Sequence, residues 1–330
     1  MFTPSNQTGK GGDTLRLYNK NILVTGGAGF IGSHLIDKLL ERNNHVRVID
    51  NLKFGNKISL QSITKVEFYK GDITNKNLMS KIMKDINIIF HLAANVGVDV
   101  VSREPLETMI TDAIGVRNIV DIGNKEGVEK IIFASSSMVY DKDIDTPIDE
   151  ETRVSPTNCY SVGKLFVETY LMENFKQKGC PVTILRLFNV YGPRQDERMV
   201  IPRFFKAAIN NAPLKVYGDG KQIRDFTYVE DVTEAFIAAA ECQRTDGKIY
   251  NISKGTEISI YQLAKLIIKV TGSRSKIEFE EIPLERKNFE VKRRVSTSSK
   301  FEKDTGFTCK TELVEGLKKC YIYYKMRWKR

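Results

Sequence analysis

The chain has 330 residues, of which 41% are hydrophobic and 28% charged, and it carries a formal net charge of +10. This balance is typical of a globular protein with a substantial core and excludes an intrinsically disordered chain. No apolar run approaches the ~20 residues of a membrane-spanning helix, and Lys and Arg are mixed with acids rather than gathered in one patch. We therefore expect no membrane and no nucleic-acid partner.

Residues 1–19 contain no apolar stretch, so we expect a flexible tail rather than an export signal. The five cysteines are odd in number and lack metal-ligand spacing, which favours reduced thiols in the cytoplasm and no metal site. The C-terminal run KMRWKR, residues 325–330, predicts a solvated basic tail, with a contact to nucleic acid or a membrane surface as the alternative.

The first half of the chain alternates short β-rich runs with helical patterns. The runs are almost continuously apolar, as in strands buried on both faces, and this alternation predicts an α/β fold with a doubly wound parallel sheet of the Rossmann type. The predicted strands are 21–25, 46–50, 66–69, 86–91, 130–135 and 182–187, and the predicted helices are 30–42, 75–84, 106–126 and 161–178.

After residue 188 the pattern changes to a segment rich in Pro, Gly, Tyr and Arg. We expect the chain to return briefly to the sheet near 226–231 and 249–252, and to end in a small α/β cap from about Ser259. The predicted larger domain is 20–188 with the returns near 226–254, and the smaller one is 189–225 with 255–330. Their cleft lies at the carboxyl edge of the sheet, where such folds bind ligands.

The run TGGAGFIG at 25–32 follows the first strand and opens the first helix. Glycines at 26, 29 and 32 permit a tight turn, a close approach of backbone to a diphosphate, and close packing of helix on sheet. The helix N-terminus, at Phe30 and Ile31, favours the phosphates. This pattern predicts a dinucleotide site.

Asp50 closes the second strand, where a carboxylate accepts hydrogen bonds from the ribose of NAD and repels the 2′-phosphate of NADP. Asn51 follows it. Asp72, before Ile73, is placed to bind the adenine edge or to cap a helix. The small residues of HLAA at 91–94 either let the cofactor lie close to the backbone or serve only in packing. The cofactor contacts predicted there are Leu92, Ala93 and Ala94.

Tyr160 and Lys164 share one face of a predicted helix because they are four residues apart. An ammonium and a positively charged nicotinamide ring stabilise a phenolate, so the pair can take a proton from a hydroxyl while hydride leaves the same carbon. Ser135, Ser136 and Ser137 end the fifth strand, where a hydroxyl can reach the same oxygen or form a turn.

Taken together, these residues resemble the NAD-dependent sugar-nucleotide epimerase/dehydratase branch of the extended short-chain dehydrogenase/reductases. The resemblance runs from about residue 20 to 319. It rests on TGGAGFIG at 25–32, HLAA at 91–94, SSSMVY at 135–140, YSVGK at 160–164, NVYGPRQ at 189–195 and VYGDGKQIRDFTYVED at 216–231. It implies NAD as cofactor, a C-terminal domain for a nucleotide-sugar substrate, and a homodimer formed through a helix bundle.

The resemblance also implies residue roles. Tyr160 is the base, Lys164 its partner and Ser136 the catalytic hydroxyl. The implied substrate contacts are Ser136, Ser137, Tyr160, Asn189, Val216, Tyr217, Gln222, Arg224 and an Arg within 286–294, for which we take Arg286. Tyr217 and Gln222 are equally consistent with loop packing.

The choice of reaction depends on two positions. Dehydratases of this family carry Asp-Glu right after the catalytic hydroxyl residue, and decarboxylases usually keep the Glu, whereas this chain has Ser137 and Met138. A Met cannot transfer a proton, so the resemblance favours 4-epimerisation of a UDP-hexose or UDP-N-acetylhexosamine. Epimerisation at another carbon, decarboxylation, dehydration, ketoreduction and a non-catalytic NAD-binding protein stay open.

The chain departs from the family's usual pattern near the site. Gly97 stands where many relatives have Ser, Asp112 replaces a usual Asn, and Asp141 replaces a Gly after Tyr140. These departures leave the identity of the sugar open.

Overall fold

The computed structural model describes residues 17–95, 103–142, 144–145, 147–284 and 290–328. Most of the predicted N-terminal tail, Gly97 and Arg286 lie outside these residues. No helix in the described ranges is long and apolar enough to cross a membrane.

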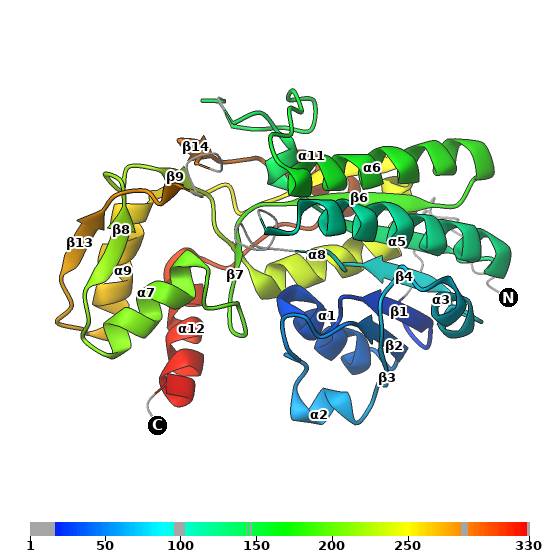
Figure 1. The fold of residues 1–330 in the computed structure, drawn as a ribbon, viewed down its shortest axis with the longest axis horizontal. Helices are drawn as coiled ribbons and strands as arrows, with labels where there is room; N and C mark the ends of the chain where they lie inside the picture. Colours follow the sequence, from blue (N-terminus) through cyan, green and yellow to red (C-terminus); the bar gives the residue numbers. More distant parts are fainter. Residues whose placement is uncertain (1–16, 96–102, 143, 146, 285–289, 329–330) are drawn as a thin grey trace, which may run out of the picture.

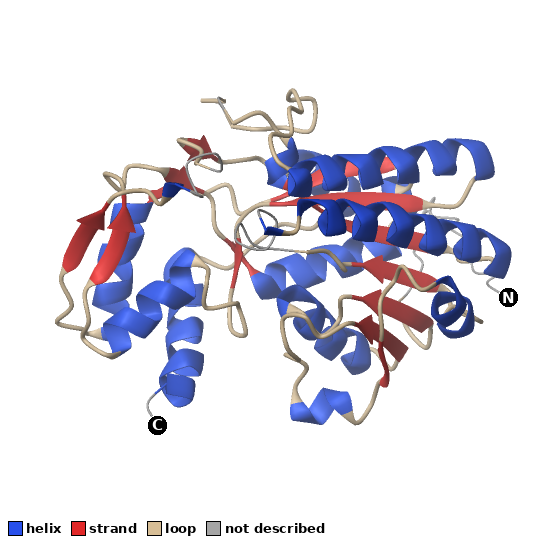
Figure 2. Cartoon of the chain, viewed as in Figure 1, coloured by secondary structure: helices blue, strands red, loops and turns tan. Residues whose placement is uncertain are grey.

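A seven-stranded, entirely parallel sheet forms the larger part of the molecule, in the order β11-β6-β5-β4-β1-β2-β3 (Figures 1 and 2). This confirms the predicted Rossmann-type fold. Its strands are β1 (Asn21–Thr25), β2 (His45–Asp50), β3 (Glu67–Lys70), β4 (Ile88–His91), β5 (Lys130–Ser136), β6 (Val182–Leu187) and β11 (Lys248–Ile252).

Helices cover both faces of the sheet. Alternate residues of each strand enter opposite cores, as the pleat requires: Ile22 and Val24 face one core and Leu23 faces the other. The first core includes α1 (Phe30–Glu41) and α8 (Val229–Glu241), and the second includes α3 (Lys76–Ile82), α5 (Pro105–Glu126) and α6 (Cys159–Lys178). The strands are apolar throughout because both faces are buried.

A third core holds the smaller part together, at the left of Figure 1. Phe204 and Phe205, Leu263 and Ile267, and Leu317 and Tyr324 bring three helices onto a small parallel strand pair. These elements are α7 (Val200–Ile209), α9 (Ile260–Thr271), α12 (Leu313–Trp328), β8 (Leu214–Tyr217) and β13 (Ile277–Glu280).

Short elements connect the two parts. Strand β9 pairs with both β12 and β14, and β7 pairs with β10. These strands are β7 (Val190–Tyr191), β9 (Ile223–Arg224), β10 (Thr227–Tyr228), β12 (Ile258–Ser259) and β14 (Arg293–Arg294). The remaining short helices are α2 (Leu60–Ile63), α11 (Ser299–Thr305) and the single turns η1 (Ser137–Val139) and η2 (Gln243–Thr245).

Three sequence-based expectations need correction. The segment near 226–231 does not join the main sheet: it forms β10, which pairs with β7, and then the start of α8. Helix α11 packs on the main sheet through Phe301 rather than in the cap, so we propose that it belongs to the larger domain. Residues 325–328 are the last turn of α12, not a free tail, because Trp328 stacks on Tyr324 at 4.4 Å between ring centroids.

Candidate active site

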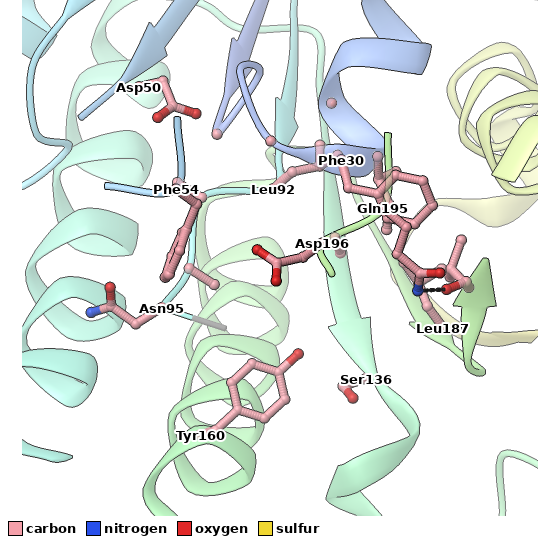
Figure 3. Close-up of a pocket in the computed structure, with 18 of the residues that line it drawn as sticks. Phe30, Asp50, Phe54, Leu92, Asn95, Ser136, Tyr160, Leu187, Gln195 and Asp196 are labelled. Carbon is pink, nitrogen blue, oxygen red and sulfur yellow. Dashed lines mark hydrogen bonds between the residues drawn. The ribbon is translucent and has the colours of Figure 1, made fainter. Parts of the chain in front are cut away.

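A cavity of about 490 Å³ lies at the carboxyl ends of β1, β2, β4 and β5, where the smaller part meets the sheet. Figure 3 shows Asp50 at one end and Tyr160 with Ser136 at the other. Of the predicted residues, the structure places these on its wall: Gly26, Gly29, Phe30, Ile31, Gly32, Asp50, Asn51, Asp72, Ile73, Leu92, Ala93, Ala94, Ser135, Ser136, Ser137, Tyr160, Lys164 and Asn189.

The glycine turn is held by close packing that side chains would prevent. Gly26 has a φ of +69°, and a Cβ there would lie 2.7 Å from the Cα of Ala93. A Cβ on Gly32 would lie 2.6 Å from the carbonyl oxygen of Gly26. Helix α1 therefore begins directly against the ends of β1 and β4.

Acidic side chains at the Asp50 end of the cavity have fixed hydrogen-bond partners. Asp50 accepts hydrogen bonds from the N–H groups of Ala28 (3.0 Å) and Leu52 (2.8 Å), which fix its carboxylate at the wall. Asp72 accepts from Thr74 N–H at 2.9 Å and from Asn51 at 3.3 Å. Asn75, not Asp72, caps α3, so the capping alternative for Asp72 is wrong.

The other end is set by the start of α6. Asn158 and Ser161 form a reciprocal capping box that begins the helix at Cys159, and this places Tyr160 in its first turn and Lys164 one turn later. The ammonium of Lys164 donates to the carbonyl of Ala134 at 3.0 Å and lies 5.8 Å from the centre of the Tyr160 ring. Ser136, the last residue of β5, turns the chain by accepting the N–H of Met138 at 3.2 Å.

Burial dominates the electrostatics of this end. It raises the pKa of Tyr160 to about 12, against a hydrogen bond with Ser136 that lowers it. Burial also lowers the pKa of Lys164, against the carboxylates of Asp112 and Glu168. The expected lowering of this pKa involves the nicotinamide ring as well as Lys164, and the protein side chains by themselves leave the phenol protonated at neutral pH.

Four described residues predicted to bind substrate do not line the cavity. Val216 is buried in the third core, and Tyr217 packs under the guanidinium of Arg203 at 4.6 Å. Gln222 donates to the carbonyl of Tyr217 at 2.9 Å, which favours the loop-packing alternative for this pair. Arg224 is fixed by hydrogen bonds to the carbonyls of Ile223 (2.9 Å) and Val291 (2.7 Å).

Arg224 has a basic neighbour within the range 286–294 that the sequence indicated, at Arg294 rather than at Arg286. The register of β9 and β14 sets Arg294 opposite Arg224, whereas Arg293 pairs with Glu257 and Arg286 lies outside the described residues. Burial and the charge of Arg224 lower the pKa of Arg294 to about 10. Asn189, on the cavity wall, donates to the carbonyl of Asp225 at 2.9 Å and so connects the cavity to this arginine pair.

The cavity also has wall residues outside the predicted set. Several of them follow motifs that could have indicated them, namely the loop after Asp50, the position after Ser137 and the continuation of NVYGPRQ, whereas Asn95, Thr111 and Leu187 follow none of these. They include Phe54, Lys57, Asn95, Thr111, Met138, Leu187, Asp196, Arg198 and Met199.

Residues 193–199, which we call the strap, cross from the smaller part onto α1 and the loop after β2. The carbonyl of Pro193 bonds His34 at 2.9 Å, and Arg194 forms an ion pair with Asp37 at 2.7 Å. Arg198 stacks 4.9 Å from the ring centre of Phe54. The strap thus closes one side of the cavity through contacts far apart in the sequence.

The fold and the site together have a counterpart in a known family. Residues 22–253 match the model described as the NAD dependent epimerase/dehydratase family. The chain belongs to this family. Its cofactor is therefore NAD, as predicted, and it is an enzyme of the NAD-dependent epimerase/dehydratase family.

Relatives within this family differ in activity. The chain is 39% identical over 284 residues to a UDP-N-acetyl-alpha-D-glucosaminuronate decarboxylase of Bacillus cytotoxicus, covering 80% of this chain and 88% of the relative. It is 34% identical to the dTDP-D-glucose 4,6-dehydratase of Homo sapiens, and the match covers 79% of this chain and 77% of the relative. The crystal structure of a UDP-glucose 4-epimerase from Thermotoga maritima, solved with UDP-glucose, superposes with a TM-score of 0.87 at 33% identity. This superposition covers 93% of this chain and 99% of the epimerase.

The geometry of the cavity fits NAD. The N-cap of α1 is Gly29, which gives no side-chain hydrogen bond to the first turn, so the N–H groups that begin the helix are available to a diphosphate. In the described residues no cluster of His, Cys, Asp or Glu could hold a metal ion.

Proposed function

We propose that this protein is an NAD-dependent nucleotide-sugar 4-epimerase, acting on a UDP-hexose or UDP-N-acetylhexosamine. The observation that carries the proposal is the placement of Tyr160, Lys164 and Ser136 on one end of the cavity whose other end is the glycine turn. A sugar hydroxyl between Tyr160 and Ser136 would have a base on one side and a hydrogen-bond partner on the other.

Within this proposal each side chain has a distinct task. Tyr160 accepts the proton of the C4 hydroxyl, and Ser136 holds the same oxygen. Lys164 holds positive charge beneath the phenol from its anchor on the Ala134 carbonyl. NAD, when bound, accepts the hydride and adds a positive charge that favours the phenolate. The 4-keto sugar would then turn over, take the hydride back on the opposite face of C4, and receive the proton on its oxygen from Tyr160.

The residues after Ser136 support epimerisation over elimination. Ser137 and Met138 line the cavity where proton transfer to C5 or C6 would need an acid or base. The carboxylates on the described wall are otherwise engaged: Asp50 and Asp72 with backbone N–H groups, and Asp196 with Arg198 at 2.7 Å. The proposed reaction needs only one proton and one hydride.

Decarboxylation of a nucleotide-linked sugar acid is the second candidate. It is favoured by the 39% identity to a decarboxylase. The first step would be the same oxidation at C4, with Tyr160 taking the proton and hydride passing to NAD. The resulting 4-keto acid would lose carbon dioxide to leave an enolate, which must take a proton at C5 before hydride returns to C4. The two reactions thus differ in the substrate that the cavity admits and in the need for a proton at C5.

The arginine pair supports a diphosphate substrate. Arg294 is buried and the adjacent Arg224 is half-buried, with Glu290 3.9 Å from Arg224. Two guanidiniums held side by side away from solvent repel each other unless an anion lies near both. We propose that the diphosphate of the substrate is this anion, with Asn189 between it and the sugar.

The exposed faces of α5 and α6 support a homodimer. The two helices pack side by side on one face of the sheet (Figure 1). Each leaves apolar side chains in solvent: Leu106, Met109, Ile110 and Ile114 on α5, and Val162 and Phe166 on α6. A patch of this kind on paired helices is typical of a helix-bundle interface. We also propose a cytoplasmic location, because the five cysteines are free.

The function is tested by incubating the NAD-loaded enzyme with UDP-glucose, UDP-N-acetylglucosamine, UDP-glucuronic acid and dTDP-glucose, followed by proton NMR. The proposal predicts a C4 epimer of a UDP-hexose or UDP-N-acetylhexosamine, and loss of at least about a hundredfold in rate on Tyr160→Phe. Tyr18→Phe, an exposed phenol remote from the cavity, is the matched control. Carbon dioxide release, or a 4-keto-6-deoxy product, would contradict the proposal.

A further inference from the structure

Asp112 is a carboxylate buried directly behind the catalytic helix. It lies on α5 with 1% of its surface exposed, next in sequence to Thr111 on the cavity wall. Its Oδ2 accepts no hydrogen bond from any residue that the structure describes. A buried carboxylate in this state is costly unless an opposite charge stabilises it.

The chain makes room for this carboxylate at Gly163. A Cβ on Gly163 would lie 2.2 Å from Oδ2 of Asp112, so the carboxylate occupies the volume that any side chain at position 163 would take. The next residue is Lys164. The absence of a side chain at 163 therefore brings the carboxylate of α5 against the backbone that carries the catalytic lysine.

The other charges around Lys164 have partners of their own. Glu168, also on α6, accepts hydrogen bonds from Arg186 of β6, from Nε to Oε1 at 3.0 Å and to Oε2 at 3.3 Å and from Nη2 to Oε2 at 2.7 Å, and it accepts the hydroxyl of Ser135. His91 of β4 is neutral at physiological pH, because burial lowers its pKa to about 3. Tyr160 is protonated unless its phenolate is specifically stabilised. Among the described residues that face Lys164, Asp112 is thus the carboxylate without a competing cation.

We propose that Asp112 is a positioning residue that supplies the counter-charge of the Lys164 ammonium and keeps it protonated while Tyr160 ionises. Burial disfavours the charged forms of both Asp112 and Lys164, and each charge opposes that effect on the other. Gly163 completes the arrangement by leaving space for the carboxylate. This inference rests on the catalytic roles proposed for Tyr160 and Lys164.

The first test is the pH dependence of kcat/KM in Asp112→Asn, which keeps the shape and removes the charge. Without the carboxylate the pKa of Lys164 falls, so the alkaline limb of the profile should move to lower pH by about one unit or more. Asp121→Asn, on the solvent side of the same helix and paired with Arg117, should leave the profile unchanged. A profile of Asp112→Asn identical to that of the wild type would overturn the proposal.

A second readout does not depend on turnover. The protein is loaded with NAD and labelled with 15N-lysine. The Nζ resonance of Lys164 then reports directly whether this side chain is an ammonium or an amine. The resonance is assigned by its loss in Lys164→Arg. It should titrate at lower pH in Asp112→Asn and in Gly163→Ala, whose Cβ displaces the carboxylate. The double variant should shift no further than either single one. An unchanged titration of Lys164 would refute the role of Asp112. If the titration shifts as expected but the protein has no epimerase activity, only the proposed function is refuted.

Discussion

At Tyr160, burial and charge act in opposite directions on one phenol. Burial raises its pKa to about 12, so the side chains around it hold a proton that catalysis must remove. In the proposed mechanism, the positive charges that favour the phenolate are Lys164 and, when NAD is bound, its nicotinamide ring. We therefore propose that cofactor binding promotes ionisation of Tyr160.

The arginine pair carries a prediction at the same scale. Arg224→Ala removes one of two adjacent guanidiniums proposed to bind the substrate diphosphate, so KM for the nucleotide sugar should rise by roughly tenfold to a hundredfold. The kcat should change much less, because the arginine is remote from the reacting carbon. Steady-state kinetics with Arg274→Ala, an exposed arginine on another loop, provides the control. An unchanged KM would mean that Arg224 serves only to hold its loop.

Local sequence patterns predicted the residues whose roles depend on local geometry. The glycine turn, Asp50, and the four-residue spacing of Tyr160 and Lys164 all lie on the cavity as expected. The sequence placed the partner of Arg224 only within 286–294, because the position of Arg294 beside Arg224 comes from the pairing of β9 with β14, about seventy residues apart. For Tyr217 and Gln222 the sequence left two alternatives open, and the hydrogen bond between them favours loop packing.

At the scale of elements, the strap explains how an enzyme of this family could retain its cofactor. It crosses from β7 to α7 and is anchored to α1 and to the loop after β2. Such cross-domain contacts depend on how the two parts dock, which periodicity in the sequence does not encode. The packing of α11 on the main sheet and the stacking that ends α12 depend on such docking as well.

Arg194→Ala should loosen the strap, because it removes the ion pair with Asp37 and the hydrogen bond to the carbonyl of Ser33 at 3.1 Å. We expect NAD to dissociate about tenfold faster, since one partly buried pair is worth about 1 kcal/mol or somewhat more. The measurement is the NAD remaining after gel filtration, or its exchange with labelled NAD. Lys176→Ala, which breaks an exposed pair with Glu173, is the control. Equal retention in both variants would show that the strap does not hold the cofactor.

The helix pair α5–α6 gives the second prediction at this scale. Phe166 is 44% exposed and belongs to the apolar face of this helix pair. Phe166→Asp therefore places a charge in that face. The protein should change from dimer to monomer in size-exclusion chromatography with light scattering. Leu60→Asp, which alters an exposed apolar residue on α2 instead, should leave the mass unchanged. A monomeric wild type would contradict the proposed interface.

For the whole molecule, the buried His91 and the half-buried His34 make stability depend on pH. Burial lowers the pKa of His34 to about 4 and that of His91 to about 3, whereas an unfolded histidine titrates near 6.5. The unfolded chain therefore binds these protons first, and stability that is complete above pH 6.5 is lost as the pH falls toward the folded-state values. Each histidine should cost about 2 kcal/mol by about pH 5.

Denaturant unfolding at about pH 7.5 and about pH 5 tests this prediction, with His34→Gln expected to remove about half of the difference between the two conditions. His45, the third histidine, is exposed, so His45→Gln should leave the difference intact. A pH dependence unaffected by His34→Gln would show that this side chain is protonated in the folded state.

The central claim is that hydride leaves C4 of a nucleotide sugar and returns to the same carbon within one turnover. It is tested most directly with UDP-sugar deuterated at C4, following product by NMR and NADH by absorbance. The account predicts a C4 epimer that keeps its deuterium at C4, with no net NADH. Deuterium lost from C4, accumulated NADH, or a product shortened by one carbon would contradict it.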